Sequence, residues 1–285
     1  MLTIVQRSGG MRGKPREVVR GYSSRLPWAW DGLCFAVAFN DATQDSARDL
    51  VWGAAPSAVN GLVWTHDNRG NPAASLADDT WIAYPANPAH NRPSTAITAY
   101  VRLLRHSVRE SGTSYSGVLG KRYDGASPPY NSWEIFGDAS NTSLSGHIAV
   151  GGGGAYQEVE SAYVLPTTEW MNAVLRWRSG EAPRLDIIGD RGDVRDTQVF
   201  GSTVTGTIDY AVGQPITFNA AETDTSNYCA TYSQGLLWSR YLTDVEIQAF
   251  IEDPYGWYSP RRQTVGMSSL YPLFGGSFMR QVSSG

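Results

Sequence analysis

The sequence lacks the features that mark membrane-spanning, disulfide-rich or strongly charged proteins. No apolar run reaches the roughly 18 residues that a membrane helix needs. No apolar stretch of about 7–15 residues follows the basic N-terminal residues, so we expect no cleavable secretory signal. Two cysteines are too few for a disulfide framework, and charged residues are only 18% of the chain. These absences favour a globular domain that is held together by its core.

The residues that are abundant favour β-structure. The 285 residues include 30 glycines, 10 tryptophans and 15 tyrosines. Aromatic residues are enriched in strands, and glycine allows the tight turns between them. The length suits one large β-sandwich or two small domains.

Charge is unevenly distributed along the chain. Residues 1–30 carry a net charge of +5, which leaves −9 for the rest of a chain whose total is −4. A basic arm on an acidic body can dock on an acidic surface, whereas the simpler alternative is a solvated tail. The basic residues of this arm are Arg7, Arg12, Lys14, Arg16, Arg20 and Arg25.

Short blocks between residues 30 and 258 resemble, in order, those of laminin-G-like domains with the concanavalin A-type jelly roll. Residues 30–40 read WDGLCFAVAFN, like the "G-L-x-x-A-W-x-F-N" opening of that family, and residues 235–247 read GLLWSRYLTDVEI, like its closing "V-x-I-Y-x-R-A-L-S-x-x-E-I". Intermediate blocks match at residues 96–104, 118–121, 133–136, 169–177, 185–190 and 216–220. The resemblance implies an all-β jelly roll of two sheets, with strands at these blocks.

One short helix is expected after the last strand. Thr243 is a good N-cap, and Glu246 completes a capping box. Pro254 limits the helix at Asp253. The following residues 253–260, DPYGWYSP, resemble an "N-P-W-x-x-F-x-P" tag of laminin-G-like proteins from bacteriophages. We therefore expect a basic extended arm at 1–29, a jelly-roll domain at 30–260 and a C-terminal tail at 261–285.

The cysteines lie near the two ends of the expected domain. The family resemblance implies that the first and last strands lie close together, so a bridge between Cys34 and Cys229 is possible. Two buried free thiols are the stronger expectation, since nothing else indicates an oxidising compartment.

Catalytic motifs are absent or incomplete. Glycosidases that share the concanavalin-like fold carry "E-x-D-x-x-E" on one strand, but Glu158 and Glu160 have no third carboxylate in place. The spacing of Glu134 and Asp138 is wrong for one strand face. The four histidines are scattered, and neither a nucleophile elbow nor a complete P-loop is present. We predict that the protein is not an enzyme.

Binding residues are more plausible than catalytic ones. Loop oxygens could bind calcium, although turn formation explains the same residues; the candidate ligands are Asp138, Asn141, Asp190, Asp193 and Asp196. Exposed tryptophans could stack on sugar rings. Trp28, Trp30 and Trp257, at the two ends of the domain, are the candidates, and the other tryptophans are expected in the core. No other cofactor is expected.

The resemblance implies a non-enzymatic structural protein of a phage virion, either a capsid decoration or a tail-associated protein, assembled in the host cytoplasm. Its expected partners are major capsid or tail components and further copies of itself, for instance in a trimer. The alternative is a lectin-like adhesion module that binds host surface glycans.

Overall fold

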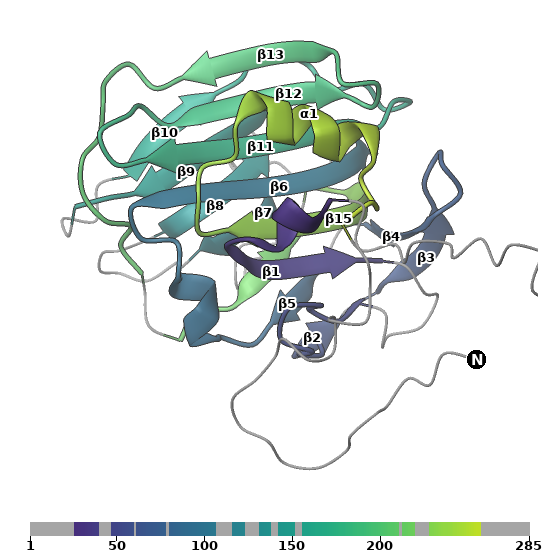
Figure 1. Cartoon of the computed structure of the whole chain (residues 1–285). Helices are drawn as coiled ribbons and strands as arrows, with labels where there is room; N and C mark the ends of the chain where they lie inside the picture. The colour runs from purple at the N-terminus through teal and green to yellow at the C-terminus, as the bar shows by residue number, and fades with distance from the viewer. Residues whose placement is uncertain are drawn as a thin grey trace, which may run out of the picture.

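The computed structural model describes most of the expected domain (Figure 1). The described residues are 26–39, 47–59, 61–77, 80–106, 116–122, 131–137, 142–151, 156–210, 213–219 and 228–257. The arm residues up to Arg25 and the tail from residue 258 lie outside them.

The described chain forms two antiparallel sheets that pack face to face, so the predicted all-β sandwich is confirmed. Sheet A has the order β13-β12-β11-β6-β15-β4-β3, with β1 also paired to β15. Its strands are β1 (Leu33–Ala38), β3 (Val63–His66), β4 (Pro72–Leu76), β6 (Ala96–Arg105), β11 (Met171–Arg178), β12 (Arg184–Gly189), β13 (Val194–Val199) and β15 (Ala230–Trp238).

Sheet B has the order β10-β9-β8-β7-β14-β5-β2. Its strands are β2 (Ala58–Val59), β5 (Ile82–Tyr84), β7 (Ser116–Arg122), β8 (Asn131–Gly137), β9 (Leu144–Ala149), β10 (Tyr156–Glu160) and β14 (Ile216–Phe218).

The core lies between the two sheets because alternate side chains of each strand point inward. On β6 these are Ile97, Ala99, Val101 and Leu103. Trp133 of sheet B and Trp177 of sheet A are fully buried in the same cluster, as expected for tryptophans in strands. Burial of such large apolar side chains is the main driving force for this packing.

The first and last strands pair, and their register explains the state of the cysteines. β1 runs antiparallel to β15, with Leu33 opposite Trp238. Cys34 therefore lies beside the end of β15, whereas Cys229 precedes its start. Both thiols are buried and free, so the prediction of two buried free thiols is confirmed.

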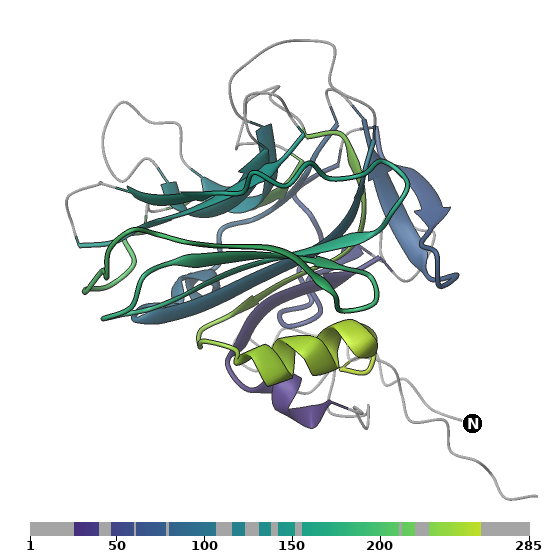
Figure 2. The ribbon, with the colours of Figure 1, turned by 90° about the horizontal axis from the view of Figure 1, so that it is seen from above.

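A third layer covers the outer face of sheet A (Figure 2). It consists of the helix α1 (Asp244–Glu252) and the short 3-10 helix η2 (Pro27–Trp30). Another 3-10 helix, η4 (Pro88–Asn91), precedes β6. The predicted capping box is present: Thr243 Oγ1 accepts from Glu246 N, and the Glu246 carboxylate accepts from Thr243 N. Phe250 and Ile251 pack from α1 against this face.

The folded part begins earlier than the sequence indicates. Residues up to 29 were expected to belong to an extended arm, but Pro27 starts η2, where its fixed φ suits the first helical turn. Ala29 is fully buried, and its carbonyl accepts a 2.7 Å hydrogen bond from Trp238 Nε1. Residues 26–29 thus belong to the outer layer of the sandwich.

Among the described helices, none has the length and apolar character needed to cross a membrane.

Candidate functional site

The outer face of sheet B carries a row of ionisable side chains. Glu134 on β8 is paired with His147 on β9, and His147 is paired with Glu158 on β10. Their strand neighbours Trp133, Ile148 and Val159 belong to the core. Because side chains alternate along a strand, the three ionisable groups project from the opposite face of the sheet.

A second row beside the first extends this surface. It runs from Phe136 through Ser145 to Glu160. We call these two rows the sheet B face; it comprises Glu134, Phe136, Ser145, His147, Glu158 and Glu160. The Phe136 and His147 rings lie 5.2 Å apart. The face therefore combines carboxylates, an imidazole, a hydroxyl and an aromatic ring on a rigid ladder.

Burial decreases across the sheet B face toward the edge strand. Glu134 and His147 are buried, Glu158 is half-buried and Glu160 is exposed. Glu134 Oε2 lies 3.8 Å from His147 Nε2. Partial burial, together with the nearby Glu160 carboxylate, raises the pKa of Glu158. The accessible end of the face is thus the end that carries Glu158 and Glu160.

Gly120 on β7 provides the space for Glu134. The two residues are paired across strands, and a Cβ at Gly120 would lie 2.6 Å from Glu134 Cγ. Because glycine has no Cβ, the Glu134 side chain can pack directly on the backbone of β7 at this position. This close approach is a reason for a glycine in the middle of a strand.

Sequence reasoning missed this constellation because its members come from three strands. The search for a third carboxylate beside Glu158 and Glu160 was confined to one strand, and the histidines were compared only along the chain. One sequence signal was present: Glu134 lies between the apolar residues Trp133 and Ile135, which predicts that its side chain points away from the core. The register that joins β8, β9 and β10 cannot be read from that alternation.

The tryptophans proposed for sugar stacking lie in the outer layer of sheet A. Trp257 is fully buried, so its ring is not offered to a ligand. Trp30 is half-buried; its ring lies 5.4 Å from that of Trp257, and its Nε1 donates to Trp257 O at 2.8 Å. The half-buried Trp28 ring lies 5.8 Å from the Arg240 guanidinium. Their contacts join the two ends of the described chain.

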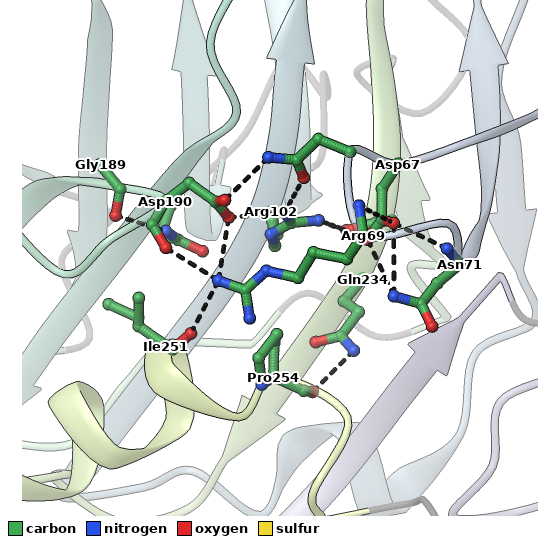
Figure 3. Close-up of polar contacts among 12 residues, drawn as sticks. Asp67, Arg69, Asn71, Arg102, Gly189, Asp190, Gln234, Ile251 and Pro254 are labelled. Carbon is green, nitrogen blue, oxygen red and sulfur yellow. Dashed lines mark hydrogen bonds and ion pairs between the residues drawn. The ribbon is translucent and has the colours of Figure 1, made fainter.

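Asp190, proposed as a calcium ligand, accepts instead from arginines (Figure 3). Arg102 Nη2 donates to Asp190 Oδ1 at 2.6 Å, and Arg69 Nη2 donates to the same oxygen at 3.2 Å. Asn68 donates to the other carboxylate oxygen. Burial would raise the pKa of Asp190, but the hydrogen bonds from Arg102 and Asn68 outweigh it and hold the pKa below its usual value.

The other calcium candidates do not meet in the described structure. Asp193 pairs with Arg195 at 2.6 Å, and Asp196 accepts from Ser161 and Gln198. Within the described ranges, no three acidic, histidine or cysteine side chains cluster in a way that could hold a metal ion. Asp138 and Asn141, like the basic arm residues, lie outside the described residues, so their roles stay predictions.

A groove of about 520 Å³ lies between α1 and the neighbouring strands of sheet A. It was not anticipated from the sequence, because it depends on how α1 packs against the sheet. Its lining residues are Arg176, Arg184, Asp186, Ile188, Val194, Asp244, Val245, Ile247, Gln248, Ala249 and Glu252.

Comparisons with known proteins identify the fold. Protein-family models and curated sequences gave no match. Among solved structures, the binding domain of Paraclostridial Mosquitocidal Protein 1 aligns with a TM-score of 0.58 at 14% identity, over 79% of this chain and 55% of that one. The binding domain of Botulinum Neurotoxin serotype G aligns with a TM-score of 0.56 at 9% identity, over 77% and 50%. Trypanosoma rangeli sialidase aligns with a TM-score of 0.52 at 12% identity, over 77% and 32%.

The chain thus spans between about a third and just over half of the length of these structures. At identities this low the likeness concerns the fold and not the function. The chain is a jelly-roll β-sandwich of a kind that occurs in toxin binding domains and in a sialidase.

Proposed function

We propose that this protein is a non-enzymatic glycan-binding module that recognises its ligand through the sheet B face. The proposal rests on the two rows of side chains that cross β8, β9 and β10. Glu158 and Glu160 lie on the edge strand β10, where these rows reach solvent. A rigid sheet holds these groups in fixed positions, which lowers the entropic cost of binding.

The chemistry of the sheet B face suits an uncharged saccharide. Carboxylates accept hydrogen bonds from sugar hydroxyls, and hydrogen bonds to charged groups are stronger than neutral ones. The buried rings of Phe136 and His147 pack against each other beneath this edge and help to hold the face rigid. The acidic balance of the chain after residue 30 disfavours anionic ligands such as sialylated or sulfated glycans.

The likeness to solved structures supports a binding role without specifying the ligand. Two of the aligned structures are binding domains of toxins. One aligned structure is a sialidase, so hydrolysis is tested together with binding. The carboxylates to test are Glu134 and Glu158, whose backbones stand two strand spacings apart, about 9–10 Å.

The test is a glycan array probed with the full chain, with a hydrolysis assay on the same sugars. We expect saturable binding to a set of uncharged glycans and no release of product. A blank array would contradict the proposed function. The matched surface control is Glu181→Gln. If the wild type and this control hydrolyse the sugar and Glu158→Gln does not, the protein is an enzyme and the proposed binding function is wrong.

We further propose that the N-terminal segment, residues 1–25, attaches the sandwich to a larger assembly, and the sequence resemblance favours a phage virion as that assembly. The structural support is the junction between the described ends. Leu26 N donates to Gly256 O at 3.3 Å, and Trp30 contacts Trp257. The described chain therefore begins and ends beside α1, on the side opposite the sheet B face (Figure 2).

Removal of residues 1–25 tests this attachment. The cut stops before Leu26 because residues 26–30 belong to the folded domain. We expect the full chain to form an oligomer or to bind virion proteins, and the shortened chain to lose that association while its sandwich stays folded. Size-exclusion chromatography with light scattering measures the oligomer, and unchanged association after removal of the arm would contradict the proposal.

A further inference from the structure

The groove beside α1 is apolar at its rims and charged at its floor. Val194 on β13 and Val245 on α1 line it, with 60% and 79% of their surfaces exposed. They are two of the five large apolar residues that are exposed in the described part of the chain. Ile188 and Ile247 form buried apolar walls between them.

Ion pairs around the buried Arg176 fix the floor of the groove. Arg176 donates to Asp186 and to Asp244, each at 2.6 Å, and to Leu242 O at 2.8 Å. Arg184 Nε donates to Asp186 at 2.7 Å. These pairs occupy the end of the groove that lies at the N-terminus of α1.

The opposite end of the groove carries one carboxylate, Glu252. Glu252 is exposed there, and its carboxylate accepts from Gln248 Nε2 at 3.0 Å. The last carbonyls of α1 are not part of this charge, because Arg69 donates to Glu252 O at 3.4 Å and to Ile251 O at 3.3 Å. The lining as a whole contains three carboxylates and two guanidinium groups. A basic segment with apolar side chains would complement both the charge and the rims.

We propose that the groove binds residues 261–285 of the same chain. This segment contains Arg261, Arg262 and Arg280 and no acidic residue, and its apolar residues are Val265, Met267, Leu270, Tyr271, Leu273, Phe274, Phe278, Met279 and Val282. Its composition therefore matches a groove with valine rims, an exposed Glu252 and one more carboxylate than guanidinium groups in its lining.

The connection is long enough for the segment to reach the groove. The described chain ends at Trp257, five residues after Glu252. An extended chain spans about 3.3 Å per residue, and the nine residues of α1 rise by about 1.5 Å each. Residues 258–285 can therefore run along the whole helix. The short tether gives this segment an advantage over the same segment of another copy.

Hydrogen exchange of the full chain tests the proposal, since docking would slow exchange of the amides in 261–285. Lysines at the rims should repel the basic segment without disturbing the core, because both valines are exposed. We expect protection in the wild type and at least a roughly tenfold loss of protection in Val194→Lys and in Val245→Lys. Val63→Lys, at a 62% exposed position on the edge strand β3, is the matched control.

A charge exchange provides a second, independent measurement. Reversal of Arg261 and Arg262 to Glu should reduce protection, and the additional Glu252→Arg change should restore part of it. Exchange at the intrinsic rate in the wild type, or equal protection in Val63→Lys and the two rim variants, would overturn the proposal. Protection that rises with protein concentration would overturn it in favour of a second copy as the occupant.

Discussion

Arg102 joins more parts of the sandwich than any other arginine described above. Its guanidinium donates to Asp67 at 2.8 Å, Asn68 at 2.7 Å and Asp190 at 2.6 Å, and it lies 4.6 Å from the Trp170 ring. These contacts connect β6 with the β3–β4 turn and the β12–β13 hairpin (Figure 3). The side chain is fully buried, so its charge depends on these partners.

Replacement of Arg102 by Met should destabilise the protein by about 3–5 kcal/mol, because Asp67 and Asp190 would lose their buried partner. Arg69→Met is the control: that side chain is 29% exposed, and its loss should cost about 1 kcal/mol or less. Chemical denaturation at pH 7 measures both. The Arg102→Met deficit should narrow below about pH 4, because Asp190, whose pKa Arg102 lowers in the wild type, is then protonated in the variant. Equal costs for the two variants would contradict this account.

Lys121 should give stability an alkaline pH dependence. Its ammonium is buried, donates to Gln214 O at 2.6 Å, and has its pKa lowered by burial to about 8. Because the unfolded chain binds this proton more tightly, stability rises as pH increases from about 8 to 10.5, by about 3 kcal/mol at most. Chemical denaturation across that pH range should show the free energy of unfolding increasing in the wild type, and no such increase in Lys121→Met. The same pH profile in both proteins would exclude Lys121 as its source.

At the scale of elements, local patterns predicted much of the fold. The capping box at Thr243 and the apolar run of β1 are short-range signals, and both elements occur where they were expected. β4, with its run PAASL, has a weak strand pattern and was missed; its pairing with β15 and β3 stabilises it. Likewise η2 was missed, because its packing on Trp238 is a contact across more than 200 residues.

The capping box is expected to stabilise α1 and the surface it covers. Thr243→Ala removes the acceptor for Glu246 N and should cost about 1 kcal/mol. Thr203→Ala, in an exposed loop, should leave stability within about 0.5 kcal/mol of the wild type. Thermal unfolding followed by tryptophan fluorescence is suitable, since Trp238 packs against Phe250 of α1. Equal losses of stability in the two variants would contradict a stabilising role of the Thr243 cap.

At the scale of the whole molecule, three layers place the proposed attachment side and the proposed recognition face on opposite sides of the core. The outer layer on sheet A holds the junction of Leu26 with Gly256, and the sheet B face lies on the other side of the core. The sequence indicated the sandwich through its ordered blocks, yet not the sheet B face, because Glu134, His147 and Glu158 meet only through strand register. The calcium candidate Asp190 illustrates the same limit, since its arginine partners come from distant strands and turns.

The most direct test is the affinity of the full chain for its best array glycan, measured by calorimetry with wild type and Glu158→Gln. A lost hydrogen bond to a charged group corresponds to about 1.5–3 kcal/mol, so we predict an affinity at least about tenfold weaker. Glu252→Gln, at an exposed carboxylate on the opposite side of the molecule, should bind like the wild type. Equal affinity of Glu158→Gln and the wild type would contradict recognition through the sheet B face.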